Sequence, residues 1–129
     1  MKELTGKKRI LIVDDDPGIL TMLKLLLGLE GYEPLTCSDP TEVFDRLARD
    51  KPDLVLMDAM MPKMDGLQVI RQVRVRELTH RPPILLLTGN VDQTYAREAL
   101  EGGASGIVIK PFEKEDLLEK LESLLGKRG

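Results

Sequence analysis

Short apolar runs alternate with longer amphipathic stretches along the whole chain. Apolar residues, many of them β-branched, dominate five short runs, which is typical of buried strands. The runs are residues 10–13, 32–37, 53–57, 84–87 and 106–109. Between and after them, apolar residues recur at spacings of three and four, which indicates helices that pack by one face. These stretches carry their apolar stripes over residues 20–27, 43–47, 69–73, 91–100 and 117–125.

Aspartate–proline pairs and a glycine mark some of the expected helix ends. Asp16-Pro17 and Asp39-Pro40 each place a capping carboxylate before a proline at the first helical position, the usual opening of a helix. Gly31 is expected just past the end of the first helix. The two pairs therefore predict that a helix follows each of the first two strands.

Five strands that alternate with five helices predict an α/β fold. Such a fold has a parallel sheet with helices on both faces. Right-handed crossovers make a doubly wound sheet the natural arrangement for a chain of 129 residues. No linker, repeat or low-complexity tract divides the sequence, so we expect one domain over residues 1–129.

Composition excludes several classes of function. The net charge of −3, the 3% aromatic content and the absence of Trp argue against a surface that binds nucleic acid. No apolar run is long enough for a signal peptide or a membrane span. The single cysteine, Cys37, allows no intramolecular disulfide and suits a reducing compartment. We therefore expect a cytoplasmic domain without direct contact to membranes or nucleic acid.

Chemically distinctive side chains follow four of the predicted strands. Asp14 and Asp15 follow the first strand, Asp58 the third, Thr88 the fourth and Lys110 the fifth. Open parallel sheets bind ligands beyond the carboxyl ends of their strands. One polar residue at a strand end reflects only the polarity of loops. Three carboxylates, a hydroxyl and a lysine at the same rim favour a binding site.

The residue types at this rim favour a magnesium and phosphoryl site. Clustered carboxylates repel one another unless a cation joins them, and oxygen ligands without Cys or His favour Mg²⁺ over zinc. His80, the only histidine, is interpreted as a loop residue, and Asp16 as a helix cap rather than a third metal carboxylate. A metal, Lys110 and Thr88 around Asp58 would accommodate a phosphoryl group, with Asp58 as the nucleophile.

Four segments carry a family resemblance. They are Val13-Asp14-Asp15, residues 58–66 (DAMMPKMDG), Thr88-Gly89 and Lys110-Pro111-Phe112. In this order and spacing they resemble the receiver domain of two-component response regulators, from about residue 8 to residue 125. The resemblance implies a flavodoxin-like (βα)5 fold with strand order 2-1-3-4-5. It also implies a signalling domain that assists its own phosphorylation and dephosphorylation, rather than an enzyme.

The resemblance assigns the acidic residues their roles. Asp58 would accept a phosphoryl group from a sensor histidine kinase or a histidine phosphotransfer protein. Asp15 and Asp58 would bind Mg²⁺ directly, together with the backbone carbonyl of Met60, and Asp14 would act mainly through water. Addition of negative charge at Asp58 would then shift nearby loops between two states.

The resemblance also assigns a switch region, with one departure. Thr88 would hydrogen-bond one phosphoryl oxygen, Lys110 would pair with another, and a cis peptide bond would precede Pro111. Many receivers carry an aromatic or histidine residue three positions before the lysine, where this chain has Ile107. A β-branched aliphatic side chain has no ring to rotate inward. We therefore expect activation to displace the loop from Thr88 through Gly89 to Val91 and the start of the following helix, with little rotamer change at Ile107.

Partners follow from the same resemblance. The chain has no room for a DNA-binding or catalytic output domain, so we expect a downstream protein target or an output domain elsewhere. The sequence fits either a stand-alone receiver or one excised from a longer protein. The surface formed by the fourth helix, the fifth strand and the fifth helix is the expected partner site. It is also the expected site of a phosphorylation-dependent dimer.

Three other functions compete for the same residues. A phosphatase with an aspartyl nucleophile would place a second acid where this chain has Met60. A flavin or dinucleotide site would need a glycine-rich loop after the first strand, where three aspartates stand instead. A receiver-like interaction module that is not phosphorylated would not need the complete set of acids, threonine and lysine.

Overall fold

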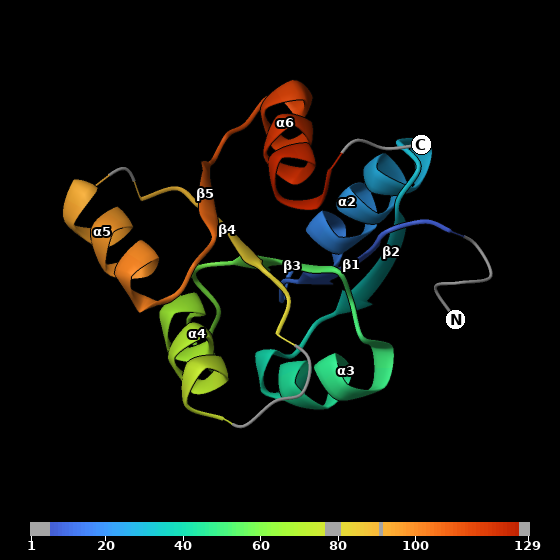
Figure 1. Cartoon of the computed structure of the whole chain (residues 1–129). Helices are drawn as coiled ribbons and strands as arrows, with labels where there is room; N and C mark the ends of the chain where they lie inside the picture. Colours follow the sequence, from blue (N-terminus) through green and yellow to red (C-terminus); the bar gives the residue numbers. More distant parts are fainter. Residues whose placement is uncertain (1–5, 77–80, 91, 127–129) are drawn as a thin grey trace.

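The computed structural model describes residues 6–76, 81–90 and 92–126 of the chain. Strands and helices alternate along these residues, as the sequence predicts (Figure 1). The elements are β1 (Arg9–Val13), α2 (Pro17–Leu29), β2 (Glu33–Cys37), the 3₁₀ helix η1 (Pro40–Glu42), α3 (Val43–Asp50), β3 (Leu54–Asp58), α4 (Gly66–Val75), β4 (Ile84–Thr88), α5 (Gln93–Gly102), β5 (Gly106–Ile109) and α6 (Lys114–Leu125). His80 and Val91, which enter the sequence predictions, lie outside the described residues.

The five strands form one parallel sheet in the order β2-β1-β3-β4-β5. This confirms the predicted doubly wound α/β fold with strand order 2-1-3-4-5. In the register, Val13 lies opposite both Cys37 and Met57, and Thr88 lies opposite Ile109. The carboxyl ends of β1, β3, β4 and β5 therefore meet at one edge of the sheet.

Helices cover both faces of the sheet. Helices α2 and α6 lie on one face, and α3, α4 and α5 lie on the other (Figure 1). Alternate strand residues point to opposite faces of the sheet. Ile10 and Ile12 therefore pack against α2 and α6. Leu11 and Val13 pack on the face covered by α3, α4 and α5. Strands β1, β3 and β4 are buried almost throughout. They hold the functional edge on a rigid support.

No described helix combines the length and the apolar character that crossing a bilayer requires.

Strand β2 forms one edge of the sheet and is less buried than β1, β3 and β4. The Glu33 N–H donates to the Lys8 carbonyl at 2.9 Å, so it points inward toward β1. Successive residues of a strand alternate in direction, and the nitrogen of Pro34 therefore points to the outer side of β2. This nitrogen carries no hydrogen to donate.

Most element boundaries agree with the sequence predictions within one or two residues. The Asp16 carboxylate caps α2, with Oδ1 accepting from the Gly18 N–H at 2.8 Å and Pro17 at the first helical position. Gly31 follows the helix with a φ of +94°, as expected for a glycine beyond a helix C-terminus. The Asp39-Pro40 pair opens the 3₁₀ helix η1, which leads into α3. The strand bounds differ at two site residues, because Asp58 and Thr88 are the last residues of β3 and β4 rather than the first loop residues.

Glycine 66 allows α4 to begin directly against the end of β3. A Cβ atom at Gly66 would lie 2.9 Å from Leu86 Cδ2 and 3.0 Å from Ala59 Cα, closer than at least nine in ten Cβ contacts in proteins, and the second of these atoms belongs to the backbone. The Gly66 N–H donates to the Ala59 carbonyl at 2.8 Å. Asp65 and Gln68 form a reciprocal capping box at the same helix end. These contacts define the path of the loop that follows the β3 carboxylate.

Candidate functional site

Three aspartates gather where β1 and β3 end. Asp14, Asp15 and Asp58 each offer a carboxylate oxygen, and these oxygens lie within 4.8 Å of one another. Asp14 and Asp58 are only 2% and 8% exposed, whereas Asp15 is open to solvent. The strand order accounts for the cluster, because β1 and β3 are neighbours although Asp14 and Asp58 are far apart in sequence. The structure thus brings the predicted acidic residues together.

Asp14 is the most deeply buried member of this cluster. Its Oδ1 atom accepts from the Asp16 N–H at 2.9 Å, but its buried Oδ2 atom has no hydrogen-bond partner within the described residues. Burial raises the pKa of Asp14, and the nearby carboxylates of Asp58 and Asp15 raise it further. The Asp16 N–H and the Lys110 charge lower the pKa, without reversing the shift. A buried carboxylate oxygen with no partner, beside two other carboxylates, fits a site for a cation and its water.

Lys110 supplies the positive charge on the other side of Asp58. Its Nζ atom lies 2.9 Å from Asp58 Oδ1, and the lysine side chain is 33% exposed. The backbone N–H of Lys110 donates to the Thr88 carbonyl at 2.8 Å and so continues the pairing of β4 with β5. The peptide bond between Lys110 and Pro111 is cis, as expected. Asp58 therefore lies between a cation and two further carboxylates.

Thr88 ends β4 at the same edge and is 1% exposed. Its Oγ1 atom accepts from the Asn90 N–H at 3.0 Å. A hydroxyl can accept and donate at once, so its proton stays free to meet an anionic oxygen. Gly89 is exposed, and a Cβ atom there would meet nothing within 4 Å. The space around Gly89 therefore gives no steric reason for glycine.

Met60 and Ile107 occupy contrasting places. Met60 lies in the loop after β3 and is 68% exposed, so any part it plays in binding a metal would come from its backbone. Ile107 is partly buried and packs against the core on the side of α3, α4 and α5. Ile107 is the second residue of β5, where the side chain has no ring to rotate inward.

Tyr95 was missed by the sequence analysis. It lies in the first turn of α5, and its hydroxyl oxygen is buried without a hydrogen-bond partner among the described residues. Burial raises the pKa of Tyr95, and the carboxylates of Asp65 and Asp58 raise it further through space. Apolar periodicity could not have identified this residue, because its relation to Asp58 depends on how α5 lies against the sheet edge.

An ion pair joins two loops beside the site. Lys63, in the loop after β3, lies with its Nζ atom 2.9 Å from Asp39 Oδ2 in the loop after β2. Hydrogen bonds from Thr41 and Lys63 lower the pKa of Asp39 to about 2. The folded protein therefore binds a proton at the Asp39 carboxylate less tightly than the unfolded chain does. The charged carboxylate stabilises the fold above pH 4, and this contribution is lost as the pH falls toward 2.

We expect Asp39→Asn to lower the melting temperature slightly at pH 7, by about 1–3 °C, because exposed ion pairs contribute little. The difference from the wild type should shrink as the pH falls from about 4 to about 2. Thermal unfolding followed by circular dichroism across this range measures it. Lys63→Gln, which removes the partner cation, should reproduce part of the loss at pH 7. A difference in melting temperature that stays constant down to pH 2 would contradict the lowered pKa of Asp39.

Comparisons with known proteins agree with this geometry. A family model described as the response regulator receiver domain matches residues 10–122. The chain is 36% identical over 118 residues to the alkaline phosphatase synthesis transcriptional regulatory protein PhoP of Bacillus subtilis, covering 92% of this chain and 48% of that protein. It is 39% identical over 117 residues to the response regulator MprA of Mycolicibacterium vanbaalenii, covering 91% and 50%. The chain thus spans about half the length of the curated relatives it matches.

Solved structures give the same result. The chemotaxis protein CheY4 of Vibrio cholerae superposes with a TM-score of 0.84 at 32% identity, over 92% of this chain and 99% of that one. The receiver domain of the sensor histidine kinase PA1611 from Pseudomonas aeruginosa has a TM-score of 0.82 at 30% identity, over 94% and 99%. That structure holds a magnesium ion coordinated in its active site cleft.

Proposed function

Since this chain belongs to the family of response regulator receiver domains, which are phosphoacceptor signalling modules of two-component systems, we propose that Asp58 is its phosphorylation site. The observation that carries this assignment is the position of Asp58 between Lys110 and two further carboxylates. Its carboxylate is nearly buried yet reaches the ligand-binding edge of the sheet. The donor we propose is the phosphohistidine of a sensor histidine kinase or of a histidine phosphotransfer protein.

The reaction is an in-line transfer between two side chains. A carboxylate oxygen of Asp58 attacks phosphorus, the bond from phosphorus to the donor imidazole nitrogen breaks, and an acyl phosphate forms on Asp58. Negative charge spreads over the three peripheral oxygens in the transition state. Lys110 neutralises part of this charge, and the Thr88 hydroxyl donates to one oxygen. Since the same groups face the acyl phosphate afterwards, we propose that the domain assists both its phosphorylation and its dephosphorylation.

The acidic cluster fits a divalent cation, for which Mg²⁺ is our proposal. Asp15, Asp58 and the backbone carbonyl of Met60 would bind it directly, and Asp14 would act through water. A bound Mg²⁺ would neutralise charge on the phosphoryl oxygens and relieve the repulsion among the carboxylates. The Oδ2 atom of Asp14, which has no hydrogen-bond partner in the described part of the chain, supports this set, because water bound to a cation can donate to it.

Phosphorylation of the whole domain tests the proposal. We expect acetyl phosphate with Mg²⁺ to add one phosphoryl group, detected by intact-mass spectrometry, and hydroxylamine to remove it as it removes other acyl phosphates. An aspartyl phosphatase would instead release phosphate continuously without accumulating the labelled form. A product that resists hydroxylamine would contradict an aspartyl phosphate.

Asp15→Asn should weaken Mg²⁺ binding by at least about tenfold, since even outer-sphere substitutions at metal sites commonly cost this much. In metal-free buffer the same variant should melt at an equal or higher temperature, because one charge of the repelling cluster is gone. Calorimetric titration with Mg²⁺ and thermal unfolding with a chelator measure the two effects. Asp16→Asn, which alters only the helix cap, serves as the matched control. Unchanged Mg²⁺ affinity in Asp15→Asn would show that the ligand assignment is wrong.

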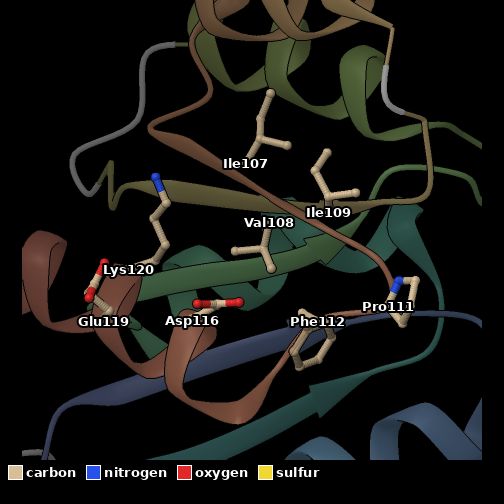
Figure 2. A pocket seen from close by; sticks show the side chains of 8 residues that line it. All are labelled: Ile107, Val108, Ile109, Pro111, Phe112, Asp116, Glu119 and Lys120. Carbon is tan, nitrogen blue, oxygen red and sulfur yellow. The ribbon is translucent and has the colours of Figure 1, made fainter.

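The partner surface we propose is formed by α5, β5 and α6. A cavity of about 370 Å³ lies on β5 and α6, and Figure 2 shows the side chains around it. Its lining residues are Ile107, Val108, Ile109, Pro111, Phe112, Asp116, Glu119 and Lys120. Exposed Ile109 and the charged residues of α6 offer apolar and ionic contacts side by side. A downstream protein, an attached output domain or a second phosphorylated copy could bind here, and we propose that this happens in the cytoplasm.

A further inference from the structure

A cavity beside the phosphorylation site has no role in the function proposed above. It has a volume of about 390 Å³ and lies between α2 and the segment that links β5 to α6. Helices α2 and α6 cover the same face of the sheet (Figure 1). The residues that line the cavity are Ile19, Met22, Leu26, Leu87, Lys110, Pro111, Phe112 and Lys114. Cavities of this volume are typical of sites for small molecules.

The walls of this cavity are mostly apolar. Ile19, Met22 and Leu26 follow one another at spacings of three and four residues, so they lie on one face of α2. Leu87 is buried, and the partly buried Phe112 packs against the same core cluster. Among the described residues that line the cavity, the charged ones are two lysines and none is acidic. This lining fits an apolar group that is attached to an anion.

Lys110 belongs both to this cavity and to the phosphorylation site. It lines the cavity, and its Nζ atom lies 2.9 Å from Asp58 Oδ1. Two further lining residues, Leu87 and Pro111, are direct chain neighbours of Thr88 and of Lys110. One lysine side chain therefore spans the distance from the cavity to Asp58. A molecule whose phosphoryl group meets Asp58 can place its remaining atoms in the cavity.

We infer that this cavity receives the acyl chain of a small phosphodonor, an acyl phosphate with a short aliphatic chain. The inference rests on the proposed phosphorylation of Asp58 and names a class of donor besides phosphohistidine. A carboxylate oxygen of Asp58 attacks phosphorus, the bond from phosphorus to the acyl oxygen breaks, and the aliphatic acid leaves as a carboxylate with that electron pair. No proton moves, and the total charge is unchanged. The lysines attract the anionic donor, and the apolar walls select it by its chain.

The chain length of the donor tests the inference. Butyryl phosphate has two methylene groups more than acetyl phosphate, and the two acids are similarly good leaving groups. Each methylene group that is buried in the transition state accelerates the reaction by up to about fourfold. Since Met22 is 44% exposed and leaves the cavity partly open, we expect butyryl phosphate to react about fivefold faster at equal, subsaturating concentration. Intact-mass spectrometry of the domain with Mg²⁺ measures both rate constants.

Variants of α2 locate the acyl chain. Met22→Ser should abolish most of the preference for butyryl phosphate, because a short polar side chain replaces one apolar wall, and Met22→Leu should restore it. Leu25→Ser is the matched control and should keep the preference of the wild type. Leu25 is an exposed leucine on the same helix, but it lines a different cavity together with Gly28 and Pro34. The ratio of the two rate constants is taken within one variant, so effects on folding or on Mg²⁺ affinity cancel.

The outcomes separate this inference from the proposed function. Equal rate constants for the two donors in the wild type would overturn the inference while the phosphorylation of Asp58 stands. A preference that Met22→Ser leaves intact, or that Leu25→Ser removes equally, would also overturn it, because the chain would then bind outside this cavity. If neither donor labels Asp58, the proposed function itself is contradicted.

Discussion

Asp58→Asn should abolish phosphorylation by acetyl phosphate under conditions in which the wild type takes up one phosphoryl group. The amide is nearly the same size as the carboxylate but is not a nucleophile that forms an acyl phosphate. It also removes one negative charge from the Asp14, Asp15 and Asp58 cluster, so the free variant should melt at an equal or higher temperature in chelator. Loss of labelling can therefore not be attributed to unfolding. Intact-mass spectrometry measures the label, and circular dichroism the stability.

Asp39→Asn is the matched control for this experiment. It removes a carboxylate from the loop after β2, where Asp39 is paired with Lys63 and is not a member of the acidic cluster. We expect Asp39→Asn to take up one phosphoryl group like the wild type. Stoichiometric, hydroxylamine-sensitive labelling of Asp58→Asn would show that another residue is the acceptor.

Lys110→Ala should separate phosphorylation from its consequences. The variant keeps the nucleophile and the acidic cluster, so we expect Asp58 to be phosphorylated still. It loses the 2.9 Å ion pair that joins Asp58 to the segment after β5. A charge-assisted contact of this kind couples two parts of a protein by a factor of about 10 to 100. The response of β5 and α6 to the phosphoryl group should therefore be largely lost.

Hydrogen exchange measures that response without a known partner. Addition of beryllofluoride and Mg²⁺ should change the exchange of backbone amides in α5, β5 and α6 of the wild type. In Lys110→Ala we expect the change in β5 and α6 to be small or absent. Lys114→Ala is the control, because Lys114 lies four residues further on and pairs with Glu30 at 3.7 Å instead. An unaltered exchange response in Lys110→Ala would contradict the coupling role.

The fold could be predicted from the sequence because its strands are nearly continuous apolar runs. Buried parallel strands need no alternation, so residues 10–13 and 84–87 are clear from composition alone. The order of the strands came from the family resemblance rather than from periodicity. Local capping chemistry was also predictable, as Asp16-Pro17 shows, because the cap and the helix start are adjacent in sequence.

The chemistry of the site was only partly predictable. The residues that follow the apolar runs identified the acidic cluster, Thr88 and Lys110, since all parallel strands end at one edge. The perturbation of Asp14 was not visible, because it depends on how deeply β1 is buried and on which backbone N–H groups reach each oxygen. The pair formed by Asp39 and Lys63 and the buried hydroxyl of Tyr95 depend on contacts between loops and helices far apart in sequence. No local pattern encodes such contacts.

The proline in the edge strand β2 bears on how this molecule meets other copies of itself. An exposed strand edge is a template onto which a strand from another molecule can add and so begin aggregation. The nitrogen of Pro34 points outward and has no hydrogen, which interrupts the row of donors along the β2 edge. The opposite edge, β5, has only four residues. Growth of the sheet by strand addition is therefore disfavoured at both ends, and association through helix surfaces is left as the favoured route.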